Sequence, residues 1–215
     1  MKYIDLTHVF DEKISIYPGG KAPIVKQINN VNDNGFASKQ LSFTSHQGTH
    51  IDGMAHMEAN GKTLNEIDLE QFEGKAIAID VRSFAGRQIP VEVFKKMETI
   101  VQKADFILLF TGWSALWGKK EYEEDFPTMT NEATAYLCKQ NIKGVGMDCF
   151  SPDPVNSPDY ANHHIAFGQE VLLIENLTNL ELLPLDELFE FQCFPMKIIE
   201  ADGAPVRAIA KVNVY

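Results

Sequence analysis

Three of the six histidines in the chain lie within eleven residues of one another. They are His46, His50 and His56, and the same segment contains the carboxylate of Asp52. Neutral imidazole and carboxylate groups are the ligands that zinc and similar divalent ions prefer in proteins. The segment therefore predicts a metal site, and with it the chemistry of a water molecule activated by a metal ion.

The spacing within this segment favours a strand over a helix. His46 and His50 alone could share one face of a helix, but Asp52 would not lie on the same face as His50. In a strand, His50 and Asp52 point the same way because side chains alternate with a period of two. Gly48 allows the chain to bend before the strand and to bring His46 to the same point. We expect His46, His50 and Asp52 to converge as three ligands.

His56 follows Gly53, where the chain is expected to turn. It would approach the site from another direction, either as a fourth ligand or as an acid/base group. A single histidine in a strand is more often a structural residue than a ligand. Four such groups on one short segment favour the metal site.

A second pair of histidines, His163 and His164, precedes the apolar run 171–174 and the carboxylate of Glu175. A carboxylate at the carboxyl end of a buried strand is well placed for a functional site. Taken alone, this pattern also fits an ordinary histidine at a helix start and an ordinary glutamate at a strand end.

Short apolar runs rich in β-branched residues recur along the chain and predict buried strands. They cover residues 76–79, 106–110, 145–147, 171–174, 196–199 and 208–212. Helices are predicted from Pro90 to Val101, from the N-cap Thr130 to near Asn141, and over 185–189. Thr63 and Glu66 have the spacing of a capping box. This order predicts a single α/β domain, residues 1–215, with a mixed sheet and helices on the outside.

The composition narrows the class of protein. The chain has 215 residues, 45% of them apolar, and a net charge of −11. Such a charge disfavours binding to nucleic acids or anionic membranes. Three isolated cysteines make a disulfide framework or a cysteine-based zinc site improbable. The start of the chain is polar too early for a signal peptide, and no apolar run is long enough to span a bilayer. We expect a cytoplasmic protein.

The string His46-x-Gly48-Thr49-His50-x-Asp52-x-x-x-His56 resembles the signature of the cyclase family of metal-dependent hydrolases. Bacterial kynurenine formamidases belong to this family, and isatin hydrolases are relatives. Weaker similarities extend over nearly the whole chain. They lie at residues 4–7, 17–19, 111–113, 144–148, 175–177 and 202–207.

The resemblance implies a fold with a barrel-like central sheet, a homodimer, and a site for two zinc ions per chain, with manganese in some relatives. His46, His50 and Asp52 match ligands of the first ion. Asp52 would bridge to the second, for which His163 and Glu175 match further ligands. His56 matches the general acid/base. Tyr17 lies in the substrate loop, where formamidases of the family usually carry tryptophan.

The expected activity is hydrolysis of a formamide or another small amide bond, as in kynurenine formamidase (arylformamidase), with a small molecule as substrate. One alternative is opening of a cyclic amide or ester, as in isatin hydrolase. Another is a protein that binds a metal or small ligand without catalysis. A third is a purely structural metal site with His56 as the fourth ligand.

Overall fold

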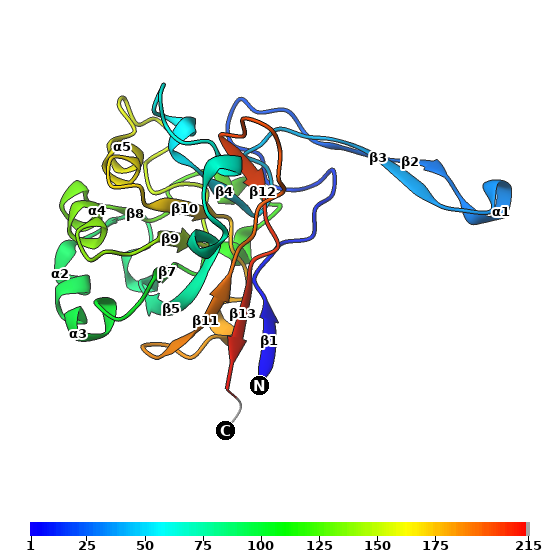
Figure 1. The fold of residues 1–215 in the computed structure, drawn as a ribbon. Coiled ribbons are helices and arrows are strands. Elements are labelled where there is room, and N and C mark those ends of the chain that lie inside the picture. Colours follow the sequence, from blue (N-terminus) through cyan, green and yellow to red (C-terminus); the bar gives the residue numbers. More distant parts are fainter. Residues whose placement is uncertain (214–215) are drawn as a thin grey trace.

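A nine-stranded sheet runs through the computed structural model of the protein, which describes residues 1–213. The strand order is β1-β13-β11-β5-β7-β9-β10-β4-β12. The sheet is curled into a half-barrel (Figure 1). In the same order, its strands are Lys2–Asp5, Ile209–Val212, Leu188–Gln192, Glu73–Asp80, Phe106–Phe110, Gly144–Met147, Leu172–Glu175, His50–Asp52 and Gly203–Pro205.

The centre of the sheet is parallel and its flanks are antiparallel. Strands β5, β7, β9 and β10 pair in parallel, and every other pairing in this sheet is antiparallel. All residues of β7, β9 and β10 are buried, and apart from Glu175 at the end of β10 they are apolar residues or glycine, as expected for strands covered on both faces. The mixed sheet predicted from the sequence is thus confirmed, as are its four central strands and β13.

Four short helices cover one side of the sheet (Figure 1). They are α2 (Val91–Lys95), α3 (Glu98–Val101), α4 (Asn131–Cys138) and α5 (Ala161–Phe167). Thr130 caps α4 as predicted, because its hydroxyl accepts a hydrogen bond from Ala133 N at 3.1 Å. The single helix predicted from Pro90 to Val101 is instead two helices, interrupted at Met97, whose φ of −110° is not helical.

Two predicted elements are wrong. Residues 185–189 were expected to be helical, but β11 begins at Leu188 and alternates buried and exposed residues because one face packs on the core. Residues 196–199 were expected to form a strand, but they form a loop in which Met196, Ile198 and Ile199 are at least partly exposed. Their apolar character therefore does not reflect burial within this chain.

The remaining elements are short. The capping box of Thr63 and Glu66 is confirmed, on a single 3-10 turn. The 3-10 helices are η1 (Met54–His56), η2 (Leu64–Glu66), η3 (Leu69–Phe72), η4 (Arg82–Phe84), η5 (Trp113–Leu116), η6 (Lys120–Glu123) and η7 (Leu180–Leu182). Strands β6 (Gln88–Ile89) and β8 (Thr128–Met129) pair separately. None of the helices within residues 1–213 has the length and apolar character needed to span a bilayer.

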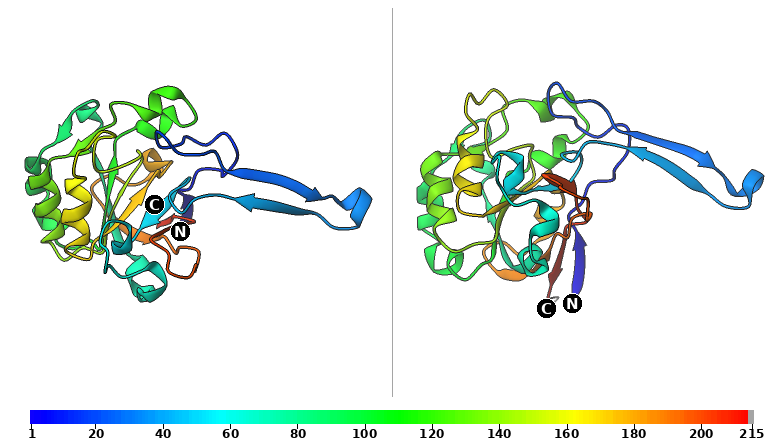
Figure 2. Two further views of the ribbon diagram at one scale, coloured as in Figure 1. Left: turned by 90° about the horizontal axis from the view of Figure 1, so that it is seen from above. Right: turned by 45° about the horizontal axis from the view of Figure 1, so that its top comes forward.

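One element projects far from the rest of the molecule. Strands β2 (Ile24–Asn29) and β3 (Ser38–Ser42) form an antiparallel hairpin with the one-turn helix α1 (Val31–Asn34) at its tip. The views in Figure 2 agree that this hairpin extends away from the sheet and its helices. We refer to residues 21–43 as the arm.

Candidate metal centre

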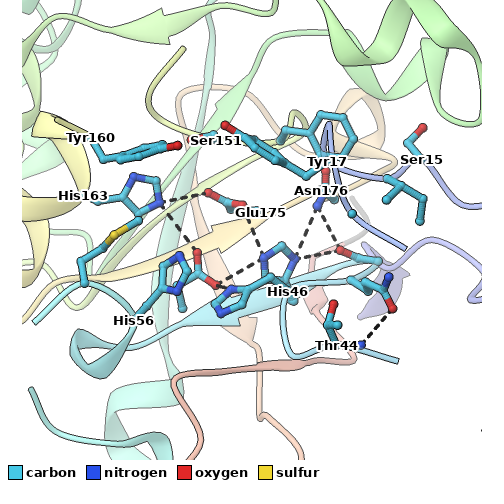
Figure 3. Close-up of a pocket in the computed structure, with 18 residues that line it drawn as sticks. Ser15, Tyr17, Thr44, His46, His56, Ser151, Tyr160, His163, Glu175 and Asn176 are labelled. Atoms are coloured by element: carbon cyan, nitrogen blue, oxygen red, sulfur yellow. Dashed lines mark hydrogen bonds and ion pairs between the residues drawn. The ribbon is translucent and has the colours of Figure 1, made fainter. Parts of the chain in front are cut away.

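The seven residues to which the sequence analysis assigned a role at the site all line one cavity of about 350 Å³. Figure 3 shows this pocket, with histidine and carboxylate side chains from separate segments pointing toward one another. The seven residues are Tyr17, His46, His50, Asp52, His56, His163 and Glu175. His164 is not among them. It is exposed, and its Nδ1 lies 2.8 Å from Glu58 Oε1.

The sheet itself brings the buried members of the site together. Strand β4 lies between β10 and β12, and its register places His50 opposite Glu175. His50 and Asp52 are two positions apart in β4, so both point into the pocket, as predicted. Gly48 has a φ of +69°, and a Cβ there would lie 2.9 Å from the ring of Phe10. This turn returns His46 to within 2.5 Å of Asp52 (Nδ1 to Oδ1).

His50, Asp52 and Glu175 form a tight buried group. His50 Nε2 lies 3.3 Å from Asp52 Oδ1 and 3.4 Å from Glu175 Oε2. The other nitrogen of His50, Nδ1, lies 2.9 Å from Gly48 O and donates to it. The lone pair of a neutral His50 would then face two carboxylates.

The hydrogen bonding and charge of this group indicate whether a divalent cation fits the site. Within the described residues, His50 Nε2 and Glu175 Oε1 are buried side-chain atoms without a hydrogen-bond partner. Burial lowers the pKa of His50, but Asp52 and Glu175 outweigh that effect and raise it well above its ordinary value. The group therefore favours a positive charge at this point. A proton or a divalent cation would supply that charge, so the donor set fits a metal ion.

His163 completes the buried side of the cluster. It lies on α5, and its Nε2 is 3.6 Å from Glu175 Oε1 and 4.0 Å from Asp52 Oδ2. Its Nδ1 lies 2.7 Å from Asp153 Oδ2, which also accepts a hydrogen bond from the backbone N–H of His163 at 3.1 Å. Asp153 thus fixes the ring so that Nε2 faces the pocket, the arrangement typical of metal-binding histidines.

His46 and His56 form the more exposed side of the cluster. Their ring centroids are 3.9 Å apart, and both rings lie near Asp202. Asp202 Oδ2 is 2.8 Å from His46 Nε2 and 3.6 Å from His56 Nδ1. His46, Asp52 and His56 form a second group of potential ligand atoms within the described residues. Gly203 is required here, because a Cβ would lie 2.4 Å from His46 Cε1.

Sequence reasoning missed Asp153 and assigned no role to Asp202. Asp202 lies in a stretch that resembles the family, but nothing in its spacing connects it with His46. Asp153 lies between two prolines, a context typical of a loop. The only signal in the sequence was an aspartate between two prolines, ten positions before His163.

The opposite wall of the pocket is aromatic. Tyr17 packs edge-on against Phe150, with ring centroids 5.8 Å apart, and donates a hydrogen bond to Val155 O at 3.0 Å. Burial, followed by the effect of Tyr160, raises the pKa of Tyr17, so its phenol is neutral. Trp117 stacks on His8 instead of lining the pocket. The cavity therefore joins a polar, cation-attracting floor to an apolar aromatic wall.

The curled mixed sheet and the histidine–carboxylate pocket define an α/β protein with a candidate divalent-metal site. Residues 4–154 match the model of the family described as putative cyclase, and the chain belongs to this family.

Several curated proteins resemble the chain over nearly its whole length. The kynurenine formamidase of Bacillus cytotoxicus is 26% identical over 212 residues, covering 98% of this chain and 97% of that protein. The kynurenine formamidase of Geobacillus thermodenitrificans is 27% identical over 207 residues, covering 96% of this chain and 95% of that protein.

Solved structures share the fold. An isatin hydrolase bound to the product analogue thioisatinate matches with a TM-score of 0.90 at 19% identity, covering 99% of this chain and 93% of that one. A predicted metal-dependent hydrolase from Bacillus stearothermophilus matches with a TM-score of 0.80 at 25% identity, and the match covers 97% of each chain. The barrel-like sheet expected from the resemblance is confirmed.

Proposed function

We propose that the chain, as one domain over residues 1–215, is a metal-dependent hydrolase that cleaves a formamide or small amide bond, as kynurenine formamidases do. The proposal rests on one observation. The side chains of His50, Asp52, Glu175 and His163 are buried close together, and two of their polar atoms, His50 Nε2 and Glu175 Oε1, have no hydrogen-bond partner. Near full-length similarity to kynurenine formamidases supports it.

We propose two ions per chain, zinc or alternatively manganese. His46, His50 and Asp52 would hold the first ion. Asp52, His163 and Glu175 would hold the second, so that Asp52 is shared. When bound, such ions would lower the pKa of a water molecule toward neutrality and polarise the substrate carbonyl.

The proposed acid/base group is His56, which is more exposed than His50 and His163. Burial lowers the pKa of His56, and the neighbouring His46 and His163 act in the same direction, against the raising effect of Asp52. A neutral imidazole accepts a proton from the attacking water and returns it to the leaving nitrogen. Its position between the cluster and the open side of the cavity suits both transfers.

Tyr17 and Phe150 would bind the substrate. Their rings present an apolar surface opposite the metal cluster, and the Tyr17 hydroxyl is already engaged by Val155 O. An aryl group carrying a formamide or amide would pack on this wall with its carbonyl directed at the cluster. The pocket therefore favours an aromatic amide over an aliphatic one.

The test is a joint measurement on protein purified without added metal. Metal content per chain is determined on the same sample that is assayed with N-formylkynurenine and with isatin, before and after treatment with a chelator. About two ions per chain and chelator-sensitive release of formate support the formamidase. Turnover of isatin alone would move the assignment to a cyclic amide. Bound metal without turnover of either substrate would favour a non-catalytic binding protein, and no metal after supplementation would refute the proposal.

We also propose that two copies of the chain associate, as the resemblance to the family implies. Sedimentation equilibrium would give twice the mass of the chain. A mass equal to one chain at all concentrations would contradict this part of the proposal without affecting the hydrolase assignment.

A further inference from the structure

We infer that Tyr122 and Asn176 are positioning residues that hold the carbonyl group of Gly48 and, through it, fix which nitrogen of His50 faces the pocket. The inference rests on the proposed function, because His50 is one of the proposed metal ligands. It goes beyond that function by assigning a role to two residues outside the proposed ligand set.

Asn176 connects the pocket with the interior of the protein behind it. It directly follows Glu175, it is buried, and its φ of +58° lies in the left-handed region, which asparagine tolerates better than most residues. Its backbone is held on both sides. The N–H donates to Cys149 O at 3.1 Å, and the C=O accepts from the Thr49 hydroxyl at 2.6 Å. The side-chain amide therefore starts from a fixed point.

The amide of Asn176 supports the carbonyl group to which His50 donates. Asn176 Nδ2 donates to Gly48 O at 3.0 Å, and His50 Nδ1 lies 2.9 Å from the same oxygen (Figure 3). A carbonyl oxygen accepts both hydrogen bonds because it has two lone pairs. Gly48 has a φ of +69°, and since glycine is conformationally permissive, the direction of its carbonyl depends on these contacts.

Tyr122 fixes the orientation of the Asn176 amide. Its side chain is fully buried, and its hydroxyl donates to Asn176 Oδ1 at 2.8 Å, closer than the alternative acceptor Asp148 O at 3.2 Å. Burial raises the pKa of Tyr122 well above its ordinary value, so the hydroxyl keeps the proton that it donates. If the amide turned over, its oxygen would lie against Gly48 O, and two acceptors would face each other.

These contacts give His50 a defined arrangement of its ring nitrogens. A lone pair on Nδ1, 2.9 Å from Gly48 O, would be repelled by that oxygen, so Nδ1 carries a hydrogen. Asn176 Nδ2 lies farther from His50 Nδ1, at 3.4 Å, which makes Gly48 O the better acceptor for both nitrogens. A metal ion binds imidazole through the lone pair of one nitrogen, and the hydrogen bond of the other nitrogen decides which one is free. The arrangement therefore keeps Nε2 as the ligand atom.

The first experiment removes the two contacts separately. Asn176→Leu keeps the branched shape of the side chain without the amide, and Tyr122→Phe removes only the hydroxyl. Asn179→Leu is the matched control. Asn179 has a φ of +57°, and its amide also donates to a backbone carbonyl, Asp5 O at 2.8 Å, but it does not line the pocket.

Competition with a coloured chelator measures the effect on zinc affinity. The affinity should fall about 10- to 100-fold in Asn176→Leu, as for other residues that orient a ligand histidine. It should fall about two- to tenfold in Tyr122→Phe, which loses a single hydrogen bond. The control should keep the wild-type affinity. Tyr122→Phe keeps the test valid if Asn176→Leu fails to fold.

A double variant tests whether the two residues act as one unit. Tyr122 reaches His50 only through Asn176, so Tyr122→Phe should lower zinc affinity no further when Asn176→Leu is present. In the Asn179→Leu background, the same change should keep its full effect. Additive losses in the double variant of Tyr122 and Asn176 would overturn the proposed chain of contacts.

NMR with isotope-labelled histidine separates positioning from a general loss of stability. The hydrogen on His50 Nδ1 should exchange slowly with solvent in the wild type, both with and without zinc, because it is buried and hydrogen-bonded. It should exchange about two- to tenfold faster in Asn176→Leu and Tyr122→Phe, whose Gly48 carbonyl is less well held. The control should exchange at the wild-type rate.

The results decide between positioning and other roles. Unchanged zinc affinity in both variants would overturn the inference and leave the proposed metal site in place. Lower affinity with unchanged exchange at His50 would reduce the two residues to a structural role, which also overturns it. A wild-type protein that binds no zinc would refute the proposed function instead. Exchange rates in the metal-free protein would then still show whether Tyr122 and Asn176 hold His50.

Discussion

Asp202 accepts a hydrogen bond from His46, with 2.8 Å between Oδ2 and Nε2, on the side of the ring opposite Asp52. We predict that Asp202→Asn lowers the affinity for zinc about 10- to 100-fold, because an outer carboxylate orients a ligand histidine and increases its basicity. Competition with a coloured chelator measures the change without reference to activity. Glu58→Gln is the control. Glu58 and His164 are also 2.8 Å apart, but neither residue lines the pocket. Unaltered affinity in Asp202→Asn would show that Asp202 does not support a ligand.

Replacement of His56 separates catalysis from metal binding. His56→Asn should lower kcat by roughly 10²- to 10⁴-fold, the usual contribution of a general acid/base, while metal content stays at the wild-type level. Metal analysis and single-turnover kinetics on one preparation measure both quantities. Loss of an ion from this variant would identify His56 as a ligand and refute the acid/base assignment.

The metal-free protein should become less stable as the pH rises from about 7 to 10. Burial lowers the pKa of His163, but the hydrogen bond with Asp153 and the nearby carboxylates of Glu175 and Asp52 raise it to about 10. Between the ordinary histidine pKa of about 6.5 and this value, the folded protein binds more protons than the unfolded chain, so stability falls with increasing pH. Denaturant titrations with and without zinc should show this loss only in the metal-free protein. A flat profile without metal would contradict the prediction.

We predict that His8 makes the protein less stable as the pH falls below about 6.5. Burial lowers its pKa to about 4, against a weaker raising effect of the Leu177 backbone, and its ring stacks on Trp117 with centroids 4.1 Å apart. Between about pH 6.5 and 4 the unfolded chain binds the extra proton, so stability falls as the pH falls. Allowing for the partial exposure of His8, this loss is ~2 kcal/mol. His8→Phe should keep the stack and flatten the profile over this range. Equal slopes for the variant and the wild type would rule out His8 as the cause.

The sequence carried enough information to predict the local part of the site. The alternation of side chains placed His50 and Asp52 on one face, and Gly48 indicated the turn that returns His46. Both inferences depend on neighbours in the chain, which a single sequence displays. They also agree with the observed strand β4.

Contacts between residues far apart in the sequence follow no local pattern, and only the family resemblance pointed to those of His163 and Glu175. Asp202 meets His46 across 156 positions of sequence, and no local pattern records that contact. The apolar run 196–199 was read as a strand because apolar residues usually indicate burial, whereas in this chain it is a partly exposed loop. The proline-flanked Asp153 likewise acquires its role only when α5 packs beside it.

Strand β4 has only three residues, and β12 beyond it at the edge of the sheet has three more. Few ladder hydrogen bonds therefore retain this edge, and it is the natural place for the native structure to open locally. An ion held by His50 of β4 and Glu175 of β10 would act as a crosslink between these strands. Chains that have not acquired metal would then open here first and expose the segment to proteases. In the cell, supply of the ion would control how long the protein survives as well as how fast it works.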